Sequence, residues 1–130
     1  NYKEKIDEYV SKGIINYYGY QSDVRPFIEK AHCFVLPSYH EGMANTLLEN
    51  ASMGRPLITS NIHGCLEAVE YSVTGFLCKK NNSDDLYRVM KKFINLSYDE
   101  RKTMGVSGRK RMEEIFDKKK VVEDTIKHIL

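Results

Sequence analysis

The sequence predicts an α/β domain with a Rossmann-like, doubly wound parallel β-sheet, and three observations lead to that prediction. Short apolar strands alternate with amphipathic helical segments along residues 14–78, as in sheets built from right-handed β-α-β units. The segment Cys33–Leu36 is apolar at every position, which is typical of a central strand covered by helices on both faces. A strand-loop-helix step over Pro37–Pro56 follows it, and parallel sheets commonly bind ligands at such a step.

Composition narrows the class of protein. The 130 residues suffice for a single domain that buries roughly two-thirds of its unfolded surface. The three cysteines, Cys33, Cys65 and Cys78, are an odd and widely spaced set, which argues against a disulfide framework or a zinc site and favours a reducing compartment. The net charge of +2 gives no reason to expect nucleic acid as a partner. Because no signal peptide and no apolar run of ~18 residues is visible, we expect a cytoplasmic protein.

The first third of the chain predicts two helices and one strand. Apolar residues at helical spacing predict a helix over about residues 3–12, which Gly13 ends. No strand precedes this helix and Asn1 is not an initiator methionine, so we expect a piece of a longer polypeptide. Ile14–Tyr18 then predicts a strand, and Asp23 is the expected N-cap of the next helix.

The remainder predicts two more strands and a helical C-terminus. Signals for strands lie at Pro56–Thr59 and Phe76–Cys78, with a short helix expected at about 66–70 between them. Three later helices are predicted from their starts, which are Ser83, the capping box Ser97-x-x-Glu100, and Asp117.

Two glutamates, Glu41 and Glu49, stand in the central strand-loop-helix step with seven residues between them. Pro37-Ser38 precedes the pair and Gly54-x-Pro56 follows it. This arrangement resembles the E-x7-E motif of the retaining glycosyltransferases of family 4. Further segments fall in the order and spacing of that family's nucleotide-sugar-binding domain, namely Tyr18-Gly19, Gly64-x-x-Glu67-x-Val69 and Gly75-Phe76-Leu77. The resemblance covers nearly the whole chain.

The helix start at this motif has chemistry of its own. Its first N–H groups, at Asn45, Thr46 and Leu47, lack intrahelical partners and favour an anion such as a diphosphate by ~0.3 to 1 kcal/mol. Glu49 can accept two charge-assisted hydrogen bonds from a vicinal diol, which ribose presents. Alternatively, Thr46-x-x-Glu49 is a capping box, which uses the glutamate with no ligand present.

The resemblance implies a role for each of these residues. It implies the C-terminal lobe of the two-lobed GT-B architecture, in which Glu49 holds the ribose hydroxyls and Glu41, the expected catalytic residue, lies near the donor sugar. Gly42, Met43 and Ala44 would offer backbone N–H groups to the sugar, although the family often has glycine where Ala44 stands. Tyr20 and Gln21 correspond to the place where the family holds the base through backbone contacts.

The predicted function is therefore retaining transfer of a sugar from a nucleoside diphosphate to a hydroxyl acceptor, a glycan or lipid-linked sugar of polysaccharide biosynthesis. No cofactor and no metal are expected. The family's Arg and Lys that neutralise the leaving diphosphate lie upstream of this chain's start, so we expect the piece alone to be inactive and the acceptor to bind a separate N-terminal lobe.

Alternatives remain open at this point. A sugar-nucleotide epimerase or a phosphorylase has a similar fold, and a non-catalytic interaction domain is a different class; a receiver-like module would need an acidic cluster that Tyr17-Tyr18-Gly19 lacks. His40 and His63 either touch donor or acceptor or are simply exposed. The basic clusters Arg109–Arg111 and Lys118–Lys120 indicate a solvated helix face or peripheral contact with an anionic membrane.

The sequence also predicts how the strands pair. We expect Ile14–Tyr18 to pair beside Cys33–Leu36, or copies of the chain to associate through the edge of that second strand.

Overall fold

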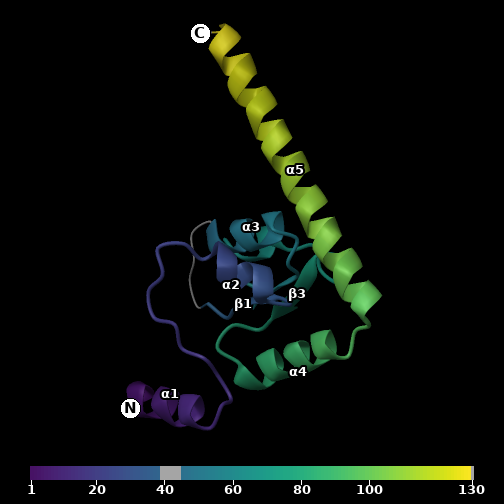
Figure 1. Ribbon diagram of the computed structural model, residues 1–130. Coiled ribbons are helices and arrows are strands. Elements are labelled where there is room, and N and C mark those ends of the chain that lie inside the picture. Colours follow the sequence, from purple (N-terminus) through teal and green to yellow (C-terminus); the bar gives the residue numbers. More distant parts are fainter. Residues whose placement is uncertain (39–44, 130) are drawn as a thin grey trace.

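The computed structural model describes residues 1–38 and 45–129, and the side chains of 116–124 and 128–129 are not described. At its centre is a three-stranded parallel sheet in the order β1-β2-β3 (Figure 1). The strands are β1 (Phe34–Leu36), β2 (Leu57–Ser60) and β3 (Gly75–Cys78). The helices are α1 (Tyr2–Ser11), α2 (Arg25–Lys30), α3 (Asn45–Ser52), the 3₁₀ turn η1 (Leu66–Ala68), α4 (Ser83–Ile94) and α5 (Tyr98–Ile129). The predicted α/β class with a parallel sheet is confirmed.

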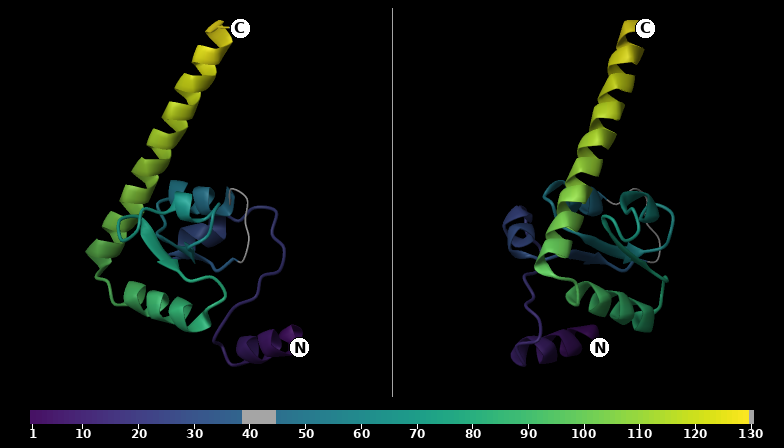
Figure 2. Two further views of the ribbon diagram at one scale, coloured as in Figure 1. Left: turned by 180° about the vertical axis from the view of Figure 1, so that it is seen from behind. Right: turned by 90° about the vertical axis from the view of Figure 1, so that its right-hand side faces the viewer.

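Helices cover both faces of the sheet because the strand side chains alternate between two apolar clusters. Leu57 of β2 packs in the first cluster with Leu47 and Ala51 of α3 and Met112 of α5. Its neighbour Ile58 packs in the second cluster, which contains Val89 and Phe93 of α4. Figures 1 and 2 show α3 and α4 on opposite sides of the sheet. This two-sided burial is the arrangement expected for parallel strands.

The central strand is β2, which corrects the expectation that Cys33–Leu36 lies at the centre. All four residues of β2 are buried, whereas the three residues of β1 are only partly buried. Strand β1 pairs with β2 alone among the described residues. Because a strand gains full cover only when it has neighbours on both sides, an apolar run does not by itself specify a central position.

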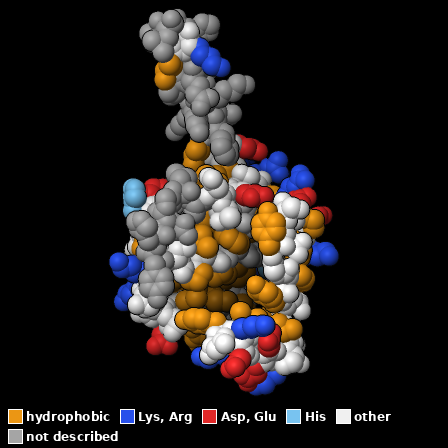
Figure 3. Space-filling view, turned by 90° about the vertical axis from the view of Figure 1, so that its left-hand side faces the viewer, with side chains coloured by type: hydrophobic (Ala, Val, Ile, Leu, Met, Phe, Trp, Pro, Cys, Tyr) orange, Lys and Arg blue, Asp and Glu red, His pale blue; other side chains and the backbone are white. Residues whose placement is uncertain are grey.

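The predicted strand Ile14–Tyr18 is also wrong. Residues 14–18 lie outside any helix or strand, and the side chains of Ile14 and Tyr17 are 64% and 69% exposed. Tyr18 instead stacks obliquely on Phe27, with 4.6 Å between the ring centroids. An apolar hollow opens on the face that carries this segment and α1 (Figure 3). A β-strand needs a hydrogen-bonding neighbour, and this segment has none in the described part of the chain.

Helix ends agree with the sequence where the cap is local. Ser97 Oγ accepts from the N–H of Glu100 over 3.1 Å, and Glu100 Oε1 accepts from the N–H of Ser97 over 3.0 Å. This reciprocal pair confirms the predicted capping box. Asp23 accepts from the N–H of Arg25 over 3.1 Å, but the N-cap position of α2 is Val24, one residue later than predicted.

Helix α5 corrects the C-terminal prediction. It runs without interruption from Tyr98 to Ile129, so Asp117 lies inside it and begins no helix. The sequence from 109 to 129 contains no glycine or proline that would end a helix. The second half of α5 projects beyond the α/β body (Figures 1 and 2). In the described part of the chain no helix has the length and apolar character needed to cross a membrane.

Candidate functional site

The candidate site is the edge of the sheet where the three parallel strands end. Leu36, Ser60 and Cys78 are the last residues of their strands. Thr59 donates its hydroxyl to the carbonyl of Leu36 over 2.8 Å, and the N–H of Asn61 donates to the carbonyl of Cys78 over 2.8 Å. These bonds join the ends of neighbouring strands, so the loops that follow start from one rigid edge.

The loop after β1 carries most of the predicted sugar contacts. Glu41, Gly42, Met43 and Ala44, together with His40, lie outside the described residues. Helix α3 follows directly, at Asn45. The structure therefore supports the strand-loop-helix step itself, and the roles of those five residues stay predictions.

The first turn of α3 presents the predicted diphosphate contacts. Asn45 and Thr46 are exposed, while the Leu47 side chain is fully buried in the first apolar cluster. Leu47 can therefore contribute only its backbone N–H, and its side chain anchors the helix start to the sheet. N–H groups in a first helical turn point out along the helix axis toward any anion placed there.

Glu49 is exposed on the same helix, within electrostatic reach of α2. The pKa of the Arg25 guanidinium is raised, chiefly by its hydrogen bond with Asp23 and to a smaller extent by the charge of Glu49. Thr46 is the second residue of α3 and not its N-cap. Thr46 thus does not occupy the N-cap position that the alternative of a Thr46-x-x-Glu49 capping box requires.

Tyr20 and Gln21 belong to the irregular segment that precedes α2. Tyr20 is 92% exposed. Gln21 donates its side-chain amide to the carbonyl of Tyr18 over 2.8 Å. Gln21 lines a hollow of about 430 Å³ with Tyr17, Tyr18, Gly19 and Phe27, and no residue of α3 lines that hollow. The structure thus groups Asn45, Thr46 and Glu49 on one helix but does not bring the predicted base contacts into the same cavity.

The loop after β2 is held by Glu67, which the sequence identified only as part of a flanking motif. Its carboxylate accepts from the N–H of Gly64 over 2.7 Å and pairs with His63 Nδ1 over 2.9 Å. Hydrogen bonds from backbone N–H groups, first its own and then that of Gly64, lower the pKa of Glu67, and His63 adds to the effect. The spacing Gly64-x-x-Glu67 is the signal for this residue, because it places a carboxylate one turn after a loop N–H.

Arg111 secures the same loop from α5. Its Nη2 donates to the Glu67 carbonyl over 2.6 Å, and its Nη1 lies 3.9 Å from the Glu70 carboxylate. Arg111 and Glu67 are 44 residues apart in sequence, so no local pattern predicts their hydrogen bond. Sequence reasoning missed Arg111 and counted it only in a basic cluster.

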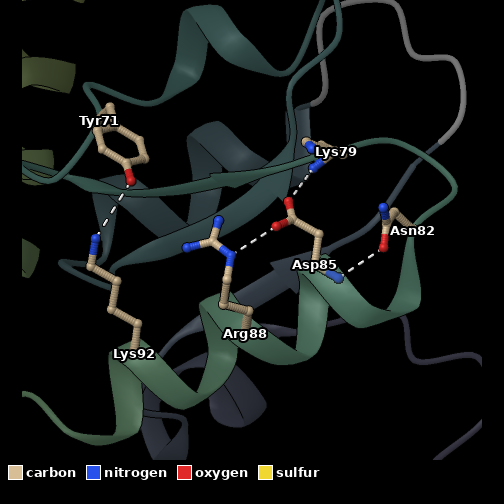
Figure 4. Close-up of polar contacts among 6 residues, drawn as sticks. All are labelled: Tyr71, Lys79, Asn82, Asp85, Arg88 and Lys92. Carbon is tan, nitrogen blue, oxygen red and sulfur yellow. Dashed lines mark hydrogen bonds and ion pairs between the residues drawn. The ribbon is translucent and has the colours of Figure 1, made fainter.

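Polar contacts around Asp85 lie directly after β3, at the same edge of the sheet (Figure 4). Asp85 accepts from the Lys79 N–H over 2.7 Å and from Arg88 Nε over 2.9 Å, while its own N–H donates to Asn82 Oδ1 over 2.9 Å. The bond from the Lys79 N–H is the largest cause of the lowered pKa of Asp85, followed by Arg88. This group fixes the turn between β3 and α4.

The described residues contain no cluster of three or more His, Cys, Asp or Glu side chains arranged to hold a metal ion. Cys33 and Cys78 are not activated nucleophiles, because burial raises the pKa of Cys33 to about 11 and also raises the pKa of Cys78.

Solved structures with this fold are glycosyltransferases and related enzymes. Sucrose-phosphate synthase from Thermosynechococcus elongatus matches with a TM-score of 0.79 and 24% identity, over 88% of this chain and 29% of that chain. Anabaena HepE in complex with UDP matches with a TM-score of 0.77 and 18% identity, over 96% and 36%. The C-terminal domain of a group 1 family glycosyl transferase from Francisella tularensis matches with a TM-score of 0.66 and 15% identity, over 84% and 59%. The fold is thus that of the GT-B glycosyltransferases.

The family follows from sequence. Residues 1–111 match the family model described as glycosyl transferases group 1, and the chain belongs to that family. The capsular polysaccharide biosynthesis glycosyltransferase CapM of Staphylococcus aureus is 33% identical over 105 residues, 79% of this chain and 27% of that protein. A Campylobacter jejuni N,N'-diacetylbacillosaminyl-diphospho-undecaprenol alpha-1,3-N-acetylgalactosaminyltransferase is 34% identical over 79 residues, 61% and 21%. The chain thus spans about a quarter of the length of these relatives.

Proposed function

We propose that this chain is the donor-binding part of a retaining, family 4-like glycosyltransferase that uses a nucleoside-diphosphate sugar. The observation that carries the proposal is the start of α3 at the carboxyl edge of the sheet, with Asn45 and Thr46 exposed and Glu49 beyond them. A diphosphate at the helix start and a ribose diol at Glu49 satisfy the N–H donors and the carboxylate together. The UDP complex of HepE, whose fold this chain shares, supports this class of donor.

We assign the remaining predicted residues to the sugar and the base. Glu41 and the backbone of Gly42, Met43 and Ala44 would surround the sugar, and Tyr20 and Gln21 would meet the base. The rigid loops held by Glu67 and Asp85 border the same edge. Stabilisation of charge on the leaving diphosphate is the main catalytic device in this scheme, and it needs no resident metal or cofactor.

The acceptor in the proposal is a glycan or a lipid-linked sugar. Two relatives carry diphospho-undecaprenol acceptors in their names, from Campylobacter jejuni and Escherichia coli. A lipid-linked acceptor would bring the enzyme to the membrane surface. The basic cluster Arg109–Arg111 adds little support for such membrane contact. Arg109 pairs with Glu113 over 3.3 Å and Arg111 turns inward to Glu67, which leaves Lys110 as the free cation there among the described residues. We place acceptor binding and full activity in the larger protein.

Calorimetric titration of UDP, GDP and ADP against the complete enzyme that carries this chain tests the proposal. We expect one nucleotide to bind clearly more tightly than the others, and a sugar nucleotide of that base to be consumed only when a hydroxyl acceptor is present. An epimerase would convert the sugar nucleotide without acceptor, and an interaction domain would bind none of the three.

A further inference from the structure

A hollow with a largely basic set of charged residues lies at the opposite edge of the sheet from the candidate site. It has a volume of about 620 Å³ and is walled by the residues before β1, the residues before β2 and the first half of α5. Its cationic lining residues are Lys30, Arg55, Arg101, Lys102 and Arg109, and among the described residues Glu29 is its only acidic lining residue. His32 lies beside them. We call this hollow the basic pocket.

The walls of the basic pocket are rigid. Arg55 Nε donates to the Ile28 carbonyl over 2.9 Å and its Nη2 donates to the Glu29 carbonyl over 2.8 Å, which fixes the end of α2 to the turn before β2. That turn also touches α5 closely, because a Cβ on Gly105 would stand 2.1 Å from the Gly54 carbonyl oxygen. This close approach of the Gly54 and Gly105 backbones keeps the two walls together.

Some cations of the basic pocket form no ion pair with a described residue. Arg101 Nε is shielded from solvent and has no hydrogen-bond partner in the described part of the chain. Lys30 and Lys102 form no ion pair with a described residue, whereas Arg109 is paired with Glu113. The nearby carboxylates Asp99 and Glu100 line a different hollow, beside Lys92. Arg111 Nε, outside the pocket, is shielded and unpartnered in the same way, so the charges that the pocket offers a ligand are those of Lys30, Arg101 and Lys102, which form no ion pair with a described residue.

We propose that the basic pocket binds a phosphate-bearing ligand, separately from the nucleotide-sugar site. Guanidinium and ammonium groups that converge on a rigid concave site recognise phosphate oxygens, which accept several charge-assisted hydrogen bonds at once. The hollow is large enough for a diphosphate or for the headgroup of an anionic phospholipid. Both sources share the same chemistry at Arg101 and Lys102.

Calorimetry with inorganic pyrophosphate tests the shared chemistry. We expect two pyrophosphates per chain, one at the start of α3 under the proposed function and one in the basic pocket. The second should bind at least about tenfold more weakly in Arg101→Gln/Lys102→Gln, since each charge-assisted hydrogen bond lost changes affinity by that order. The matched control is Lys110→Gln/Lys127→Gln, which removes the same charge from exposed sites on α5 outside the pocket. It should change binding less than about twofold, because distant surface charges are screened by salt. Circular dichroism melting verifies that each variant is folded.

Cosedimentation with phosphatidylglycerol and with phosphatidylcholine vesicles separates the two sources. Binding to phosphatidylglycerol vesicles that only the Arg101→Gln/Lys102→Gln variant loses identifies a lipid headgroup, and pyrophosphate binding without vesicle binding identifies a free phosphate. Equal losses in both double variants, or no binding of either probe, would overturn the proposal. Glu49→Ala should leave pyrophosphate binding intact, so failure here is distinct from failure of the proposed function.

Discussion

Arg111 and Glu67 join the long helix α5 to the loop after β2 through a hydrogen bond of 2.6 Å from the guanidinium to the Glu67 carbonyl. The Glu67 side chain in turn holds the N–H of Gly64 at the carboxyl edge of the sheet. Helix α5 thereby supports a loop of the candidate site from the far side of the first apolar cluster.

Replacing Arg111 by Met should destabilise the fold and loosen this loop. We expect the free energy of unfolding to fall by about 1 to 2 kcal/mol, because a charge-assisted bond to a part-buried carbonyl is lost. Urea denaturation measures the change. Arg109→Met, which removes an exposed pair with Glu113, should cost less than about 0.5 kcal/mol. Equal effects of the two substitutions would show that Arg111 has no special structural role.

The lowered pKa of Glu67 predicts a pH dependence. Because the folded-state pKa lies below the ordinary value of 4.5, the stabilisation by this carboxylate is present above pH 4.5 and is lost as the pH falls through the folded-state value. The stability difference between the wild type and Glu67→Gln should therefore be present at pH 7 and shrink below pH 4.5. Thermal melts at a series of pH values measure it. A difference that stays constant down to low pH would contradict the assignment.

Glu49→Ala tests the ribose contact. In the complete enzyme we expect nucleotide affinity to weaken by roughly 2 kcal/mol or more, from the loss of charge-assisted hydrogen bonds. The melting temperature should hardly change, because Glu49 is exposed and Thr46 does not stand at the N-cap position of α3. Calorimetry and thermal melts separate the two effects, with the exposed Glu114→Ala as control. Unchanged affinity with a lower melting temperature would instead favour a structural role.

Glu41→Ala should lower the transfer rate more than nucleotide affinity, because its proposed partner is the donor sugar. Glu41→Gln should retain part of the activity if the side chain only orients hydroxyl groups. Steady-state kinetics of the complete enzyme, alongside titration with free UDP or GDP, distinguishes the two quantities. An equal loss of free nucleotide binding would refute this role.

Residues 14–18 do not pair with β1, so association of two copies of the chain through the edge of β1 remains as the prediction. Size-exclusion chromatography with light scattering should show a mass that rises with concentration, since an unpaired strand edge recruits another strand. A monomer at every concentration would disprove it.

The parts of the candidate site that depend on residues adjacent in sequence could be predicted. The start of α3 at Asn45 could be placed because an apolar strand, a small loop and a polar helix start follow one another directly. The position of Gln21 could not be predicted, because its segment is irregular and is held by the contact between Tyr18 and Phe27. Segments without periodic structure are positioned by long-range contacts, which a sequence pattern does not contain.

The sequence by itself determined the α/β class, the apolar strands and local caps such as Ser97 with Glu100, because each depends on residues a few positions apart. Tertiary structure decided that β2 and not β1 is central and that residues 14–18 form no strand. It also decided the bond between Arg111 and Glu67. Strand position and distant hydrogen bonds depend on which segments meet in space, and burial of the whole apolar surface selects that arrangement.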